Sequence, residues 1–220
     1  MEKAYKNSGY FMLLLIALVV LGFYKTYFNQ FPNFNENSTA LSHSFVTIFD
    51  HLHAALAALV ILLLIIQPLL IRYGKFEIHK TIGKISYFIF PLLILSFIPL
   101  ILRILQTDNP ILAYLPISGC TLLILFYSLA IYNRKNTPKH MRYMIGTATV
   151  FFAPTVGRIG PILFGLQHNT TQNIQYAIIY LILIGLIFLD RKHGKNFKPY
   201  IIISIGWIIH QIVYFILFQY

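Results

Sequence analysis

The sequence has few charged residues and few of the residues on which common catalytic sites depend. Only 10% of its residues are charged and six of 220 are acidic, whereas soluble domains are roughly 25% charged. Cys120 is the only cysteine, which excludes an intrachain disulfide and a cysteine cluster. No Walker loop, His-Glu-x-x-His or Gly-x-Ser-x-Gly motif is present. Acidic residues are almost missing from the apolar stretches, which argues against a relay of carboxylates.

Apolar residues dominate instead, at 58% of the chain with a mean hydropathy of +0.72. Seven apolar stretches can be drawn: Tyr10–Tyr24, Phe45–Ile71, Ile85–Leu105, Ile111–Tyr132, Met144–Leu166, Ile174–Leu189 and Tyr200–Phe218. A membrane-spanning helix needs about 20 such residues. We therefore predict an all-α integral membrane protein, a single domain (residues 1–220) formed by a bundle of seven transmembrane helices.

The basic residues predict the orientation of this bundle. One set of alternate connecting segments holds Lys3, Lys6, Arg72, Lys75, Lys80, Lys84, Arg134, Lys135, Lys139, Arg142, Arg191, Lys192, Lys195 and Lys198. The other set, with the helix ends beside it, holds Lys25, Arg103 and Arg158. Because Lys and Arg near helix ends stay in the cytoplasm, the N-terminus is predicted to be cytoplasmic and the C-terminus outside.

The net charge of +11 is explained by the same pattern. Basic side chains on one membrane face meet anionic headgroups at about 1 kcal/mol each, so the predicted partner is the lipid bilayer and not a nucleic acid. The location predicted is an integral, multi-pass one, in the inner membrane if the host is bacterial.

Prolines and polar residues interrupt the apolar stretches. Prolines occur at positions 68, 91, 99, 116, 154 and 161. They predict kinks or helix ends packed against neighbouring helices, because each proline leaves a backbone carbonyl without its partner. The sixth stretch is the shortest after the first and is flanked by Gln172, Asn173 and Gln175. It is retained because the charge alternation requires it.

Two histidines within the predicted spans are candidate binding residues. His53 begins a seam of small residues that continues to Ala57, and small residues let helices approach closely. His210 and Gln211 lie near the predicted bilayer midplane, where a polar pair needs a partner inside the protein and indicates a functional site. The alternative for His210 is a hydrogen bond to a neighbouring helix that only stabilises packing.

His79 and His140 each open a predicted helix at the cytoplasmic face, so they are expected at one depth. If those helices are neighbours, axes about 8–10 Å apart would let both imidazoles reach a common ligand. Arg72, Lys80 and Arg142 are expected nearby, with charge suited to propionates or another anionic group. The alternative is that all of these residues anchor the bundle to anionic lipid.

The segments around these histidines resemble a family of uncharacterised bacterial polytopic membrane proteins, domain-of-unknown-function family 2306. Residues 79–87 resemble its His-Arg-x-x-Gly-x-x-Tyr signature, and residues 140–145 its His-x-x-Trp-Met-Ile segment. Residues 157–159 are similar to its Leu-Arg element, and residues 53–68 to its helix ending in Gly-Pro-x-Gln. The resemblance covers roughly residues 50–190. It departs at Lys80, Tyr143 and Gly146, where the family has Arg, Trp and Arg.

Three classes of function fit these observations. The first is a redox or assembly protein that binds haem or a metal ion through His53, His79 and His140. The second is a transporter or channel with a polar site around His210 and Gln211. The third is a non-catalytic subunit, with other membrane subunits as partners. The family resemblance implies only a histidine-bearing membrane protein, with a looser likeness to haem-associated proteins of cytochrome oxidase assembly. Together with the inner-face histidines it favours the first class, and whether the protein is an enzyme stays open.

Overall fold

The computed structural model describes residues 2–32 and 46–218, and within these ranges all regular structure is helical. The α-helices are α1 (Ser8–Phe23), α2 (Ile48–Arg72), α3 (Phe76–Leu105), α4 (Tyr114–Tyr132), α5 (Thr137–Val150), α6 (Phe152–Phe164), α7 (His168–Lys192) and α8 (Lys198–Phe218). Three short 3-10 helices precede α1, α2 and α4: η1 (Lys3–Tyr5), η2 (Phe28–Gln30) and η3 (Pro110–Ala113).

Six helical segments of the described chain are long and apolar enough to cross a membrane, with mean hydropathies of 1.3 to 2.8. They are Ile48–Arg72, Phe76–Leu105, Pro110–Tyr132, Thr137–Phe164, His168–Lys192 and Lys198–Phe218. The protein is therefore an integral, multi-pass membrane protein. Helix α1 is apolar but has only 16 residues, which gives a length of about 24 Å against a hydrocarbon core of about 30 Å. A seventh crossing stays a prediction.

Several helices extend beyond the apolar stretches from which they were predicted. Helix α3 begins at Phe76 rather than Ile85, so its basic first turns are helical. Helix α7 begins at His168 rather than Ile174 and has 25 residues, although it was predicted to be the shortest after the first. Of its polar first turns, Thr171, Gln172 and Gln175 are buried, whereas residues 168–170 are exposed. Phe45, the predicted start of the second span, lies outside the described residues, and α2 begins at Ile48.

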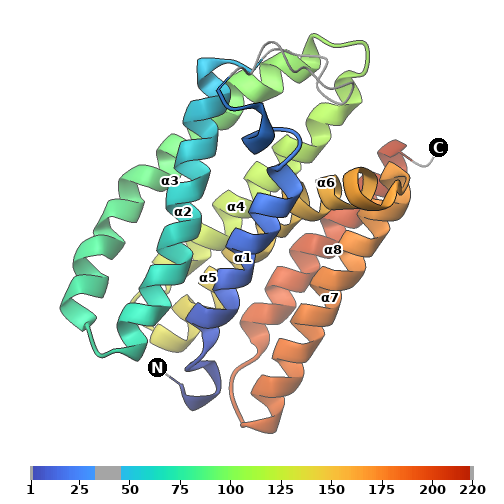
Figure 1. Ribbon diagram of the computed structural model, residues 1–220. Helices are drawn as coiled ribbons and strands as arrows, with labels where there is room; N and C mark the ends of the chain where they lie inside the picture. The colour runs from blue at the N-terminus through green and yellow to red at the C-terminus, as the bar shows by residue number, and fades with distance from the viewer. Residues whose placement is uncertain (1, 33–45, 219–220) are drawn as a thin grey trace.

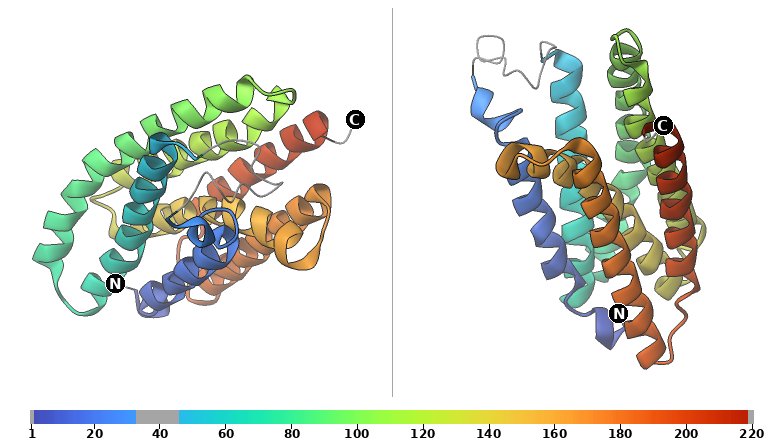
Figure 2. Two further views of the ribbon diagram at one scale, coloured as in Figure 1. Left: turned by 45° about the horizontal axis from the view of Figure 1, so that its top comes forward. Right: turned by 90° about the vertical axis from the view of Figure 1, so that its right-hand side faces the viewer.

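The fifth predicted span, Met144–Leu166, is divided in the structure. Helix α5 ends at Val150, Phe151 forms a turn, and α6 follows. Pro154 has no N–H to offer the carbonyl of Val150 and its ring crowds that carbonyl, which accounts for a break at this position. Helix α6 then runs across the upper part of the bundle, where it packs against α1 and α7 (Figures 1 and 2).

The bundle has two distinct ends. At the lower end of Figure 1 lie the start of α1 and the connections α2–α3, α4–α5 and α7–α8, and at the upper end lie the connection α3–α4 and the end of α8. Between them, buried side chains of α2, α3, α4, α7 and α8 form one core, with Phe126, Ile179 and Trp207 fully buried. Large apolar side chains such as Phe88 and Leu181 cover the outer surface, which faces lipid.

Close approach of α1 to α6 depends on Gly22. A Cβ at this position would lie 2.8 Å from the carbonyl oxygen of Thr155 and 3.1 Å from its Cα. Backbone atoms cannot move aside as a flexible side chain does, so the two helices would have to separate.

We predict that Gly22→Ala destabilises the protein by about 1–3 kcal/mol through overpacking. The measurement is the unfolding midpoint in mixed micelles with increasing dodecyl sulfate. Gly185→Ala in α7 is the matched control, because a Cβ there meets nothing within 4 Å. Equal midpoints for the two variants would contradict the packing of α1 on α6.

Candidate functional site

A buried ion pair joins α5 and α7 near the lower end. Arg142 donates from Nε to Oδ2 of Asp190 and from Nη2 to Oδ1, each at 2.7 Å, and both side chains are 1% exposed. Its Nη1 donates to the carbonyl of Pro138 at 2.9 Å. This two-pronged geometry is the strongest that a guanidinium and a carboxylate form.

The N-terminal segment closes over this ion pair. Tyr5 donates from Oη to Oδ1 of Asp190 at 2.7 Å, and Tyr200 of α8 donates to Oη of Tyr5 at 3.1 Å. Glu2 accepts from Nη2 of Arg142 at 2.7 Å. Burial raises the pKa of the Tyr5 phenol well above its usual range, so the phenol stays protonated and keeps donating. The N-terminal segment and α5 thus meet at one carboxylate of α7, and α8 joins them through the bond from Tyr200 to Tyr5.

His210 is buried in the middle of α8 and joins three helices. Its Nε2 hydrogen-bonds Oγ of Ser118 of α4 at 2.9 Å, and its Nδ1 hydrogen-bonds Oη of Tyr176 of α7 at 2.8 Å. No charged side chain bonds the ring among the described residues, and burial at this depth favours the neutral form. Both nitrogens are thus bonded, which is the packing role expected as the alternative.

The network continues on both sides of His210. One turn away, Trp207 donates from its indole nitrogen to Oγ1 of Thr149 at 2.9 Å, which connects α8 to the last turn of α5. Gln211 accepts at Oε1 from Oη of Tyr180 at 2.7 Å. Side chains of α4, α5, α7 and α8 are thus linked by hydrogen bonds within the predicted membrane region.

Two amides on α7 have no partner for their nitrogens. Gln172 is 8% exposed and Gln175 is 1% exposed, and Nε2 of each makes no hydrogen bond to any part of the chain that the structure describes. With Tyr176 they lie three and four residues apart, on one face of α7. An unsatisfied buried donor costs about 1–3 kcal/mol. This face is therefore where a water molecule or polar solute would gain most free energy by binding.

The two predicted inner histidines lie at the lower end in different environments. His140 donates from Nδ1 to the carbonyl of Ala130 at 2.8 Å, which leaves the lone pair on Nε2. Against His79, the amide nitrogen of Gln67 donates to Nδ1 and to the backbone carbonyl, the latter at 3.2 Å. The two rings are therefore held by different partners, His140 by a backbone carbonyl and His79 by an amide side chain.

The predicted basic residues do not converge on these histidines. Arg72 donates to the carbonyl of Lys6 at 2.9 Å and lies over the ring of Tyr10, 4.9 Å from its centroid. Lys80 forms an exposed ion pair with Glu77 at 2.8 Å. Arg142 is bound to Asp190, as described above. Each cation therefore already has partners within the protein.

His53 is separated from the other two predicted metal ligands. It lies in the second turn of α2, at the upper end, where its Nδ1 bonds Oγ of Ser96 at 2.9 Å. His79 and His140 lie near the opposite end. Within residues 2–32 and 46–218, no three His, Cys, Asp or Glu side chains form a group that could hold a metal ion.

The sequence analysis did not identify Asp190, Gln172 or Gln175 as site residues. Asp190 precedes the basic residues Arg191 and Lys192, and the signal for it is that an acidic residue at the end of an apolar stretch is rare in this chain. Gln172 and Gln175 were read as weakening a span. Their spacing with Tyr176 is the signal that places all three on one face.

No family model, curated protein or solved structure matches this chain. The resemblance to family 2306 therefore rests on the short motifs alone.

We predict that Asp190→Asn destabilises the protein by about 3 kcal/mol, the lower end of the cost of breaking a buried ion pair, because the buried charge of Arg142 then keeps only Glu2 as an ionic partner among the described residues. The measurement is again the unfolding midpoint in mixed micelles. Glu77→Gln is the control for loss of a carboxylate, and because its ion pair with Lys80 is exposed, no measurable change is expected. An effect of Asp190→Asn as small as that of the control would contradict the dependence of the bundle on this ion pair.

Proposed function

We propose that the protein is a seven-span transporter or channel, with its N-terminus in the cytoplasm, that binds a small solute in the upper half of the bundle. The observation that carries this proposal is the pair of buried, unpaired amide nitrogens of Gln172 and Gln175 beside the Tyr176–His210 hydrogen bond. In a bilayer, a polar group without a partner is retained where it meets a substrate or a water-filled path.

The break between α5 and α6 supports the same proposal. Phe151 at this break keeps an α-region backbone (φ −73°, ψ −13°), so the chain bends there rather than unwinding, and interrupted helices commonly form the binding sites of transporters. Helix α6 packs on α7, and a Cβ on its Gly157 would lie 3.9 Å from Oε1 of Gln175. The interrupted helix therefore lies beside the unpaired amides.

The chemistry of the solute follows from what lacks a partner. The two amide nitrogens are donors without acceptors. Such donors favour a solute with acceptor oxygens. A small carboxylate or another oxyanion is the class that complements them.

We expect that cysteines at 172 and 175, introduced after Cys120→Ala, react with a charged, membrane-impermeant thiol reagent in proteoliposomes. Reaction requires a thiolate, which forms in water and not in lipid. Ile184→Cys is the control, because Ile184 of the same helix is 62% exposed on the lipid-facing surface and should not react. If the cysteines at 172 and 175 react with the reagent as little as the cysteine at 184, the site is not accessible to water and the proposal is contradicted.

The orientation is tested separately. Thr107→Cys lies in the α3–α4 connection at the upper end, and Asn136→Cys in the α4–α5 connection at the lower end. In intact cells an impermeant reagent should label position 107 and should not label position 136, because fourteen of the basic residues cluster at the lower connections. Labelling of both positions from outside would reject this topology.

A haem- or metal-associated role is the second candidate, and one observation favours it. The Nδ1–H of His140 donates to a backbone carbonyl, which is the arrangement that orients most metal-ligating histidines and leaves Nε2 for the metal. The resemblance to family 2306 supports a histidine-based role in the same region. An absorption spectrum and metal analysis of detergent-purified protein test it, and a colourless, metal-free protein would reject it.

A further inference from the structure

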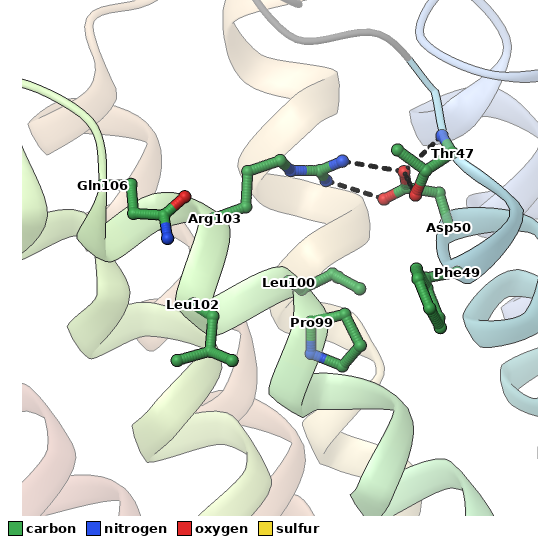
Figure 3. A pocket seen from close by; sticks show the side chains of 8 residues that line it. All are labelled: Thr47, Phe49, Asp50, Pro99, Leu100, Leu102, Arg103 and Gln106. Carbon is green, nitrogen blue, oxygen red and sulfur yellow. Dashed lines mark hydrogen bonds and ion pairs between the residues drawn. The ribbon is translucent and has the colours of Figure 1, made fainter.

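A groove on the lipid-facing side of the bundle separates the upper parts of α2 and α3. It consists of two adjoining cavities of about 260 Å³ and 220 Å³ that share Phe49 and Pro99. Figure 3 shows its upper part, where Arg103 reaches from α3 to Asp50 on α2 above Phe49 and Pro99. Neither the transport proposal nor the inner histidines use this groove.

The walls of the groove face the hydrocarbon of the membrane. Phe49 and Leu52 of α2 and Leu92 and Leu95 of α3 line it, and each is 51% to 57% exposed. Because these side chains lie within apolar spanning segments, the groove opens to lipid rather than to water. An apolar chain is the occupant that such walls accept.

The upper end of the groove is charged. Arg103 donates from Nη1 and Nη2 to the two oxygens of Asp50, at 2.8 Å and 2.7 Å, and Asp50 also accepts from the backbone and hydroxyl of Thr47. A guanidinium has five N–H donors, so three remain. Oδ1 of Asp50 accepts from Arg103 alone among the described residues, so it has room for another donor.

The floor of the groove is also polar. Ser96 lines the lower cavity and donates to the carbonyl of Leu93 at 2.6 Å, so its oxygen accepts from Nδ1 of His53 at 2.9 Å. Pro99 has no N–H for the carbonyl of Leu95, which is left with capacity to accept. A bulky side chain in place of Ser96 would fill this part of the groove.

The length of the groove matches one leaflet. From Arg103 to Leu92 the helix rises over eleven residues, which is about 16 Å and close to half of a hydrocarbon core of about 30 Å. The charged end thus lies at the level of the headgroups, and the apolar part ends near the bilayer midplane.

We propose that this groove binds one glycerophospholipid of the upper leaflet, with an acyl chain between α2 and α3 and a zwitterionic headgroup on the Asp50–Arg103 pair. The phosphate accepts from the remaining donors of Arg103. An ammonium, as in phosphatidylethanolamine, donates to Asp50. A cation and an anion side by side complement a headgroup that carries one charge of each sign.

The test is native mass spectrometry of delipidated protein in detergent, titrated with phosphatidylethanolamine, phosphatidylcholine or phosphatidylglycerol. Phosphatidylethanolamine should bind the wild type about tenfold more tightly than phosphatidylcholine or phosphatidylglycerol. The reason is that only its ammonium can donate a hydrogen bond to Asp50, and one hydrogen bond to a charged group accounts for a difference of this size. Equal binding of all three lipids would overturn the headgroup assignment, and no retained lipid would overturn the site.

Two variants locate the site. Leu95→Trp fills the groove and should abolish retention, whereas Ile98→Trp, an exposed α3 position that does not line the groove, should retain lipid as the wild type does. Asp50→Asn with Arg103→Gln removes both charges together and should equalise the three lipids. A wild-type preference in this double variant, or wild-type binding by Leu95→Trp, would reject the proposal. Unfolding midpoints without lipid establish that each variant is folded.

Discussion

The ion pair of Arg142 and Asp190 is the interaction on which the lower half of the bundle depends. Burying two charges costs desolvation free energy, which is recovered only when their remaining donors and acceptors are hydrogen-bonded. Here Tyr5 donates to Asp190, and Pro138 and Glu2 accept from Arg142. The N-terminal segment is therefore part of the bundle, because without it Asp190 would lose a hydrogen bond and Arg142 its second anion. The residues that complete this ion pair are far from it in sequence and are brought to it by the fold.

The upper half is organised by a different constraint. Its ion pair, Asp50–Arg103, lies at the edge of the bundle with side chains 17% and 35% exposed, so water and headgroups share in its solvation. Its buried polar groups are amides, hydroxyls and a neutral histidine. Neutral groups cost less to bury than ions when a partner is missing, which explains how Gln172 and Gln175 are tolerated where an unpaired carboxylate would not be.

Hydropathy predicted the helices well, because spanning segments must satisfy their backbone internally and so appear as long apolar runs. It could not predict the helical first turns of α3 and α7, since polar residues at a helix start look like a loop until their burial is known. From the sequence, the break at Phe151 could be predicted only through Pro154, one of six prolines at which a kink or a helix end was expected. Whether a proline kinks a helix or ends it depends on what the neighbouring helices offer to the freed carbonyl.

The candidate site was less predictable than the fold, because identifying it requires knowing which buried polar groups have hydrogen-bond partners. The sequence identified His210 as a costly group near the bilayer midplane and His53 and Arg142 as candidate ligand-binding residues, and the structure buries His210 and Arg142 and half-buries His53. The free-energy cost of burying a polar group does not show whether its neighbours hydrogen-bond it or leave it free for a ligand. Only the three-dimensional structure shows which partners the group has. His210 has both nitrogens bonded and so holds helices together. The amide nitrogens of Gln172 and Gln175, within about one turn of its partner Tyr176 on α7, are unpaired, and the binding chemistry belongs with the groups left unpaired.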